Sequence, residues 1–165
     1  MNNVLDLRKL KAISDHQFGK QITDIIFGDW ENLNIKKSIK TSKIRYVFWR
    51  EQLYLTLRPN NGFFTLSLHS AEKILQHVPS PKLRAIVPSE ISEFIKKGRN
   101  VFCKHIIDID ESLRPLDEVI VVDEDDNLLA IGRVKIPVPY IKTFKSGVGI
   151  NIRKGINKLK VKNHN

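Results

Sequence analysis

The sequence is poor in cysteine, with one in 165 residues. A single cysteine excludes an intramolecular disulfide and any zinc module built from several cysteines. Cys103 falls on the apolar side of a predicted strand, so we expect a small core residue. No hydrophobic run approaches the length of a membrane span, and residues 1–19 lack the apolar core of a signal peptide. We therefore expect a soluble, cytoplasmic protein with no membrane partner.

Acidic residues are missing from two long segments. Residues 127–165 contain nine Lys or Arg and residues 32–50 contain six, with no Asp or Glu in either segment. The whole chain has a formal net charge of +10 and a pI of about 9.8. This balance favours a polyanionic partner, such as nucleic acid or an acidic membrane surface. The basic segments can also be read as the solvated faces of a lysine-rich protein.

Motifs for nucleotides, metals and catalysis are absent as well. Gly147-Val148-Gly149 has Ile152 where a dinucleotide fingerprint requires a third glycine, and nothing matches a P-loop. The acidic run of residues 123–126 lacks the glycine and distal glutamate of a calcium loop, and the histidines have no ligand spacing. We expect His105 to be a hydrogen-bonded core residue. No nucleophile, base and orienting residue can be assembled, so we predict no metal, no cofactor, no catalytic residue and no autonomous enzyme.

The first half of the chain predicts helices, an antiparallel sheet and another helix. Residues 5–27 are apolar near the helical period, and Gly19 marks a kink or a join because glycine costs roughly 1 kcal/mol relative to alanine inside a helix. Strand patterns and a closing helix follow at residues 43–49, 53–58, 63–68 and 70–78. The two prolines of residues 79–81 stop that helix and mark a boundary. We therefore predict a small α+β domain over residues 1–80.

The second half starts with a short strand at residues 83–87 and continues with a short helix. Ser89 is the expected N-cap, Phe94 and Ile95 share one helical face with Ile91, and a glycine follows the last turn. Strands are expected at residues 101–109, 119–122, 128–134 and 147–153, with a hairpin tip at residues 123–127. We predict a domain over residues 81–158 and a basic flexible tail over residues 159–165.

Several of these segments resemble known families. FIKKGRNVFCKHI, DEVIVVDEDDNLLAIGRV and FKSGVGINIRKG are similar to the helix, glycine loop and strands of the PUA domain, an RNA-binding module of pseudouridine synthases and archaeosine transglycosylases. LKAISDHQFG and KIRYVFWREQLYLTLRPNNGFFTLSLHSAEKIL resemble the pre-PUA domain of archaeal tRNA-guanine transglycosylases. The resemblance implies an N-terminal domain of helices on an antiparallel sheet, followed by a PUA-type β pseudo-barrel. Relatives usually carry Gly-Asp where this chain has Leu116 and Asp117, which bears on the tightness of that turn.

The resemblance also implies a function. It is noncatalytic binding of the acceptor stem and 3′ end of tRNA, in tRNA modification by the archaeosine pathway. The catalytic barrel and zinc site of a full-length transglycosylase have no counterpart here, which implies a pair of tRNA-binding domains acting beside a separate catalytic chain or alone. Two alternatives stay open: a ribosome-biogenesis factor that binds ribosomal RNA, and a protein-interaction subunit of an RNA-modifying enzyme.

RNA binding requires cations for phosphates, exposed backbone amides and flat surfaces for unstacked bases. The loop after the predicted helix supplies the first two, and Gly149 in the closing strand is expected to leave room for a backbone approach. By the resemblance, the helix lies beside the closing strand and the cations line one groove. The predicted RNA-binding residues are Lys97, Gly98, Arg99, Asn100, Lys104, Lys142, Lys145, Gly149, Arg153 and Lys154.

Overall fold

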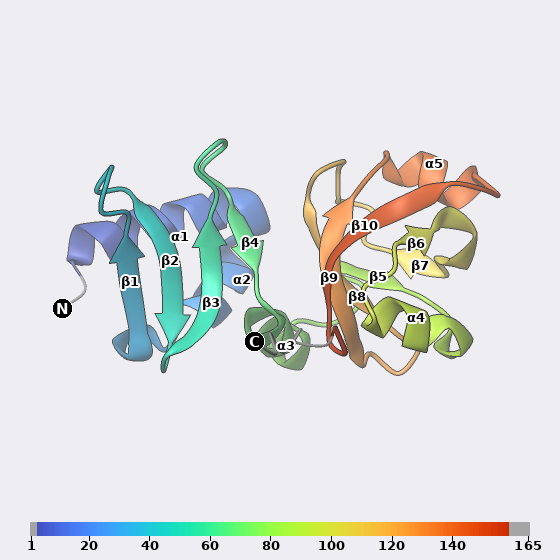
Figure 1. Cartoon of the computed structure of the whole chain (residues 1–165), viewed down its shortest axis with the longest axis horizontal. Helices are drawn as coiled ribbons and strands as arrows, with labels where there is room; N and C mark the ends of the chain where they lie inside the picture. Colours follow the sequence, from blue (N-terminus) through green and yellow to red (C-terminus); the bar gives the residue numbers. More distant parts are fainter. Residues whose placement is uncertain (1–2, 159–165) are drawn as a thin grey trace, which may run out of the picture. The chain divides into compact units, whose positions relative to one another are not determined.

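The computed structural model describes residues 3–158, and the chain divides into two compact units, Met1–Val78 and Pro79–Asn165. Figure 1 shows helices with a sheet in the first unit and a curled sheet with short helices in the second. The predicted α+β fold class, with a small helix-and-sheet part followed by a β pseudo-barrel, is confirmed. Among the described helices, none has the length and apolar character needed to cross a bilayer. The predicted basic tail, residues 159–165, lies outside the described residues.

Two helices begin the first unit. α1 is Val4–Phe18 and α2 is Lys20–Ile26, and Gly19 separates them with a φ of 89°, a left-handed conformation that favours glycine. The predicted join at Gly19 is therefore confirmed. Asn3 caps α1, because its side chain accepts a hydrogen bond from the amide of Leu5 at 2.9 Å.

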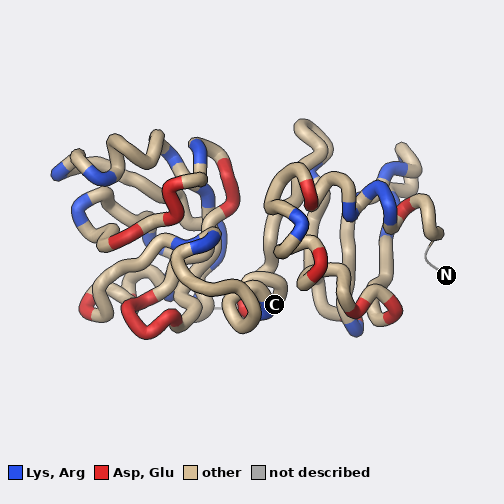
Figure 2. Tube along the Cα trace, turned by 180° about the vertical axis from the view of Figure 1, so that it is seen from behind, with Lys and Arg blue, Asp and Glu red and all other residues tan. Residues whose placement is uncertain are grey.

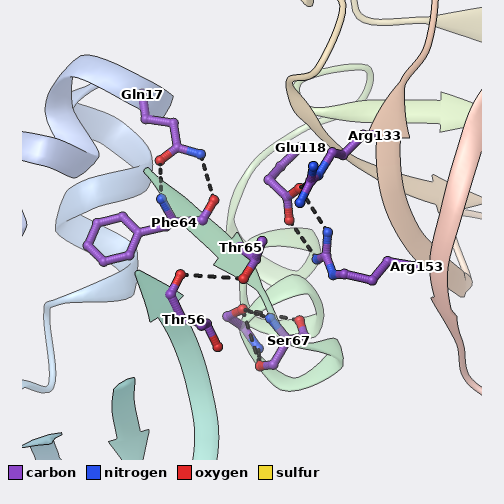
Figure 3. Close-up of polar contacts among 9 residues, drawn as sticks. Gln17, Thr56, Phe64, Thr65, Ser67, Glu118, Arg133 and Arg153 are labelled. Atoms are coloured by element: carbon purple, nitrogen blue, oxygen red, sulfur yellow. Dashed lines mark hydrogen bonds and ion pairs between the residues drawn. The ribbon is translucent and has the colours of Figure 1, made fainter. Parts of the chain in front are cut away.

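A four-stranded antiparallel sheet follows, in the order β1-β2-β3-β4. Figure 1 shows α1 and α2 on one face of it, and Gln17 of α1 fastens β4 by pairing with both backbone groups of Phe64, at 2.7 and 2.9 Å (Figure 3). Ser67 and Ser70 form a capping box at the start of the last helix of this unit. The elements are η1 (Trp30–Asn32), β1 (Leu33–Lys37), β2 (Ile44–Trp49), β3 (Gln52–Leu57), β4 (Phe64–Leu66) and α3 (Leu68–His77).

The second unit is a six-stranded sheet in the order β6-β10-β9-β8-β5-β7. β5 and β8 are parallel, and the other pairs are antiparallel. The strands are β5 (Arg84–Ile86), β6 (Val101–Phe102), β7 (Asp108–Ile109), β8 (Glu118–Val122), β9 (Leu128–Val134) and β10 (Val148–Gly155). The helices are η2 (Ser89–Ile91), α4 (Ser92–Lys96), η3 (Cys103–His105) and α5 (Val138–Thr143).

The centre of the second unit is the strand β8, in which every residue is buried. Three buried charged side chains lie in this unit, Arg84, Asp110 and Glu118, and each has polar partners. The guanidinium of Arg84 is fully buried and donates to the carboxylate of Asp126 at 2.7 and 3.1 Å. Asp110 accepts from the amide of Leu83 at 2.7 Å; burial acts to raise its pKa, but this bond and those from Ser112 lower the pKa overall.

The prediction of one strand over residues 101–109 was wrong. The segment contains two two-residue strands separated by the turn η3, because β6 pairs with β10 and β7 pairs with β5 on the opposite edge of the sheet. The turn disturbs the alternation, and Ile107 is 55% exposed although the strand pattern placed it inside.

The predicted helix over residues 89–97 needs a similar correction. It begins as the 3₁₀ turn η2, and α4 starts only at Ser92, so Ser89 is not its N-cap. Phe94, which we placed on the buried face, is 56% exposed. Ile91 belongs to η2, so α4 itself carries only Phe94 and Ile95, of which Ile95 is buried.

α4 lies against the closing strand β10 through a backbone contact. A Cβ on Gly155 would overlap the carbonyl oxygen of Lys96 and would stand 2.8 Å from the amide nitrogen of Gly98. The amide of Asn157 also donates to the Lys96 carbonyl, at 2.9 Å. Only glycine allows this approach, which positions the loop after α4 beside β10.

We expect the substitution Gly155→Ala to lower the free energy of unfolding of this unit by roughly 1–3 kcal/mol, because the added methyl must push α4 away from β10. The exposed neighbour Lys154 provides a control, and Lys154→Ala should change stability by less than about 0.5 kcal/mol. Urea unfolding followed through the amide NMR signals of β8–β10 measures both. Equal stability of the two variants would contradict the close approach.

Candidate functional site

The loop after α4 lines a pocket of about 560 Å³ in the second unit. The pocket lies between α4 with its preceding turn, the strand β6, the turn η3 and the first residue of β10. Its walls are mostly apolar, with three polar side chains among them. The lining residues are Ile91, Phe94, Ile95, Gly98, Arg99, Asn100, Val101, Phe102, His105 and Val148.

The loop itself has a fixed geometry. Gly98 has a φ of 96° and ends α4, and its amide donates to the carbonyl of Ile95 at 2.9 Å. Asn100 connects the loop to β10, because its side-chain oxygen accepts a hydrogen bond from the amide of Ile152 at 2.8 Å. Arg99 stands between these two held residues and is exposed. The fold therefore contributes one guanidinium to the pocket lining from a restrained backbone.

Two exposed aromatic rings line the same pocket. Phe94 is 56% exposed and Phe102 is 46% exposed, although both are large apolar side chains. Flat rings that remain in water beside a cation can stack against unpaired nucleobases. His105 also lines this pocket and is half-buried, so the prediction of a core histidine was wrong.

Other cations lie beside the loop. Lys97 is exposed at the end of α4, whereas Lys96 pairs with Glu93 at 3.2 Å. The side chain of Lys158 passes 3.8 Å from the point where a Cβ of Gly98 would stand. This brings a residue from just after β10 next to a loop sixty residues earlier, as the packing of α4 against β10 requires. The predicted site did not include Lys158, although the resemblance placed the helix beside the closing strand.

Lys104 and Lys145 are exposed and belong to neighbouring segments, but neither lines the pocket. The amide of Cys103 donates to the carbonyl of Gly147 at 2.9 Å, which sets the loop that carries Lys145 beside the turn that carries Lys104. These two lysines therefore lie on neighbouring segments outside the pocket. Lys154 is exposed on β10 and is also outside the lining.

Lys142 is engaged with another loop. Its ammonium group forms a short ion pair with the carboxylate of Glu111. The hydrogen bond to Glu111 raises the pKa of Lys142, and the same bond lowers the pKa of Glu111. Both side chains are solvent-accessible, so the pair holds weakly and can exchange with another anion.

Gly149 does not have the predicted role. It is buried, and a Cβ there would stand 3.0 Å from Ile106, 3.3 Å from the sulfur of Cys103 and 3.5 Å from Ile141. Side chains of the protein therefore fill the space that we had assigned to a ribose-phosphate chain. Burial also raises the pKa of the Cys103 thiol, as fits a small core residue.

Arg153 is also turned away from the predicted groove. Its guanidinium donates two hydrogen bonds to the buried carboxylate of Glu118, at 2.6 and 2.9 Å, and Arg133 approaches the same carboxylate at 3.6 Å (Figure 3). A carboxylate without water requires such partners. Arg153 thus supports the core of the unit, which corrects its assignment to the RNA groove.

The structure therefore brings together only part of the predicted set. Gly98, Arg99 and Asn100 line the pocket, and Lys97 stands next to it. In residues 3–158 no group of three or more His, Cys, Asp or Glu side chains is arranged to hold a metal ion. Phe94 and Phe102 were missed as site residues; the signal for Phe102 was its place opposite Val101 in the alternating pattern, on the polar side.

Comparison with known proteins gives two family matches. Residues 8–81 match the patch-forming domain C2 of tRNA-guanine transglycosylase, and residues 84–156 match the PUA domain. The tRNA-guanine(15) transglycosylase of Methanobrevibacter smithii is 37% identical over 153 residues, covering 93% of this chain and 23% of the relative. The corresponding enzyme of Methanosphaera stadtmanae is 38% identical, covering 92% and 23%. The chain thus spans about a quarter of the length of these relatives.

Solved structures show the same fold at low sequence identity. A hypothetical protein of Pyrococcus horikoshii OT3 superimposes with a TM-score of 0.74 at 18% identity, covering 94% of this chain and 93% of the other. A conserved PUA domain protein of Thermoplasma acidophilum gives 0.65 at 16% identity, covering 95% and 92%. These likenesses concern the fold.

Arg153 supports the core and Arg99 lies in an exposed loop, so their replacement should affect stability differently. We expect Arg153→Ala to lower the free energy of unfolding of the second unit by roughly 1–3 kcal/mol, because it removes two hydrogen bonds from a buried carboxylate. Arg99→Ala removes the same side chain from an exposed loop and should cost less than about 0.5 kcal/mol. Chemical unfolding of both variants measures the difference, and equal losses would contradict the structural role of Arg153.

Proposed function

Because residues 8–81 belong to the transglycosylase C2 domain family and residues 84–156 form a PUA domain, we propose that this chain is a noncatalytic tRNA-binding protein. The pocket at the loop of residues 97–100 receives the unpaired nucleotides at the 3′ end of the acceptor stem. The observation that carries the proposal is the exposed Arg99 beside two exposed phenylalanine rings in one pocket.

The residues of the pocket fit a single-stranded RNA end. Arg99 has a planar guanidinium that can grip a phosphate with two parallel hydrogen bonds, and Lys97 adds a second cation nearby. Phe94 and Phe102 offer faces for stacking to bases that are not already stacked in a helix. A double-stranded segment would meet the basic residues but would keep its bases away from the rings. The chemistry therefore favours a free end over a continuous duplex.

The relatives' name supports tRNA as the source of that end, since both are tRNA-guanine(15) transglycosylases. We propose that the chain delivers or retains tRNA for modification in the archaeosine pathway, with a catalytic transglycosylase chain as its partner. Lys104, Lys145 and Lys154 extend the contact along the acceptor stem by attracting phosphates, without a fixed geometry.

Removal of Arg99 tests the pocket directly. We expect Arg99→Ala to weaken binding of intact tRNA roughly tenfold, which corresponds to about 1.4 kcal/mol, because a phosphate loses its guanidinium partner. On tRNA trimmed of its 3′ CCA, the variant and the unchanged protein should bind equally. Fluorescence anisotropy with labelled tRNA at fixed salt measures all four affinities.

The matched control for Arg99 is Arg114→Ala, which removes an exposed arginine from another loop of the same unit. It should weaken intact and trimmed tRNA alike, and by less than the loss at Arg99. Equal affinity of the unchanged protein for intact and trimmed tRNA would overturn the 3′-end mode. Crosslinking and sequencing of the RNA bound in cells distinguishes tRNA from ribosomal RNA. Crosslinks confined to ribosomal RNA would favour a ribosome-biogenesis factor instead.

The aromatic contribution has its own test. We expect Phe102→Ala to weaken tRNA binding by about 1–3 kcal/mol through loss of base stacking, with little change in salt dependence because no charge is removed. Phe144→Ala is the control, since Phe144 is 49% exposed, stacks on Tyr140 and lies outside the pocket. Equilibrium binding across a series of salt concentrations measures both variants. Equal losses for the two variants would argue against stacking in this pocket.

A further inference from the structure

The first unit has a pocket of its own, of about 460 Å³. It lies between α1, the loop that joins β1 to β2 and the loop that joins β3 to β4. Its size falls in the range of small-ligand sites, roughly 300–1,000 Å³. The lining residues are Lys9, Ile13, Ser38, Thr41, Lys43, Ile44, Arg45, Leu57, Arg58, Pro59 and Gly62.

Four of the lining residues are cationic and none is acidic. Lys9 comes from α1 and Arg45 from β2, while Lys43 lies just before β2 and Arg58 just after β3. Among the described residues, no ion pair joins Lys9, Lys43 or Arg45 to a carboxylate. Asp6 of α1 is already paired with Lys37 at 2.8 Å. The charges of Lys9, Lys43 and Arg45 are therefore not neutralised by an ion pair within the described part of the chain.

Hydroxyl groups and a held backbone complete the site. The amide of Ser38 donates to the carbonyl of Lys43 at 2.8 Å, which closes the β1–β2 loop and carries the hydroxyls of Ser38 and Thr41 to the pocket wall. On the opposite loop, Gly62 has a φ of 72°, and no atom lies within 4 Å of the point where its Cβ would stand. That wall is thus open to a close approach along the backbone.

We propose that this pocket binds a phosphate group, and that the group belongs to the backbone of bound RNA. Ammonium, guanidinium and hydroxyl groups that line one pocket can together satisfy several oxygens of one phosphate. Five of the lining residues come from the segment of residues 32–50, which has six Lys or Arg and no acidic residue. Figure 2 shows Lys and Arg positions close together at the end of this unit where its chain begins.

The phosphate site stands on the first unit alone, and only its RNA source rests on the proposed tRNA-binding function. A phosphorylated small molecule offers the same chemistry to the same residues. The test therefore has one arm for the phosphate and one for the RNA. The two arms use the full chain, one pocket variant and one control variant of equal charge.

The pocket variant is Lys9→Gln with Lys43→Gln, two exposed lining residues whose replacement leaves the core intact. The control is Lys20→Gln with Lys36→Gln, two exposed lysines of the same unit outside the pocket. Both variants lower the net charge by two. Circular dichroism and thermal unfolding establish that each is folded as the unchanged protein is.

The first arm titrates inorganic phosphate at constant ionic strength, with amide NMR as the readout. In the unchanged protein and the control, we expect saturable shifts at Thr41, Lys43 and Gly62. In the pocket variant, the phosphate affinity obtained from the shifts at Thr41 and Gly62 should be at least fivefold weaker. Absence of saturable shifts in the unchanged protein, or equal shifts in the two variants, would overturn the phosphate site.

The second arm measures affinity for intact and 3′-trimmed tRNA over a range of salt. We expect the pocket variant to weaken both roughly five- to tenfold and to lower the slope of log K against log salt by about 1–2, since each phosphate contact contributes roughly 0.7–0.9. The control should change affinity less than twofold. Equal losses in the two variants would overturn RNA as the source. The expected loss is the same for intact and 3′-trimmed tRNA. This test of the first-unit pocket therefore remains valid even if the 3′-end proposal fails.

Discussion

The arrangement of the second unit depends on one backbone contact, the approach of Gly155 in β10 to the last turn of α4. This contact sets a five-residue helix across the end of the closing strand and leaves its final carbonyl bonded to residue 157. The loop after the helix then has two fixed ends, one at Gly98 and one at Asn100. A short helix has little stability of its own, so the position of Arg99 follows from tertiary packing.

In the binding mode that we propose, the two pockets make different contacts to RNA. The pocket of the second unit has mostly apolar walls, two exposed rings and one guanidinium, which suits bases together with a single phosphate. The pocket of the first unit has four cations and hydroxyls, which suits charge without bases. If both units contact RNA, a substitution in either pocket changes the affinity for RNA. A contact to the bases supplies selectivity, and a contact to phosphate supplies strength that falls with salt.

The features of the fold that depend on local sequence pattern were predicted well. The join at Gly19, the hairpin of β8 and β9 and the glycine at the end of α4 all follow from local pattern. The segment of residues 101–109 could not be read correctly, because its two halves pair with strands that are far apart in the chain. For the candidate site, the basic loop and the resemblance selected Arg99 but also Arg153, whose partner Glu118 lies thirty-five residues earlier. Burial of Gly149 likewise depends on side chains from distant segments.

The buried carboxylate of Glu118 has a wider electrostatic consequence. It draws two arginines, Arg133 and Arg153, toward the interior and offsets much of their field at the surface. The outward charge of the closing strand and its neighbours therefore comes mainly from lysines, whose ammonium groups attract an approaching polyanion without fixing its orientation. In the proposed binding mode, long-range attraction speeds the first encounter with RNA, and final orientation depends on Arg99, the single arginine among the residues that line the pocket. Capture and alignment are thus carried by different kinds of side chain.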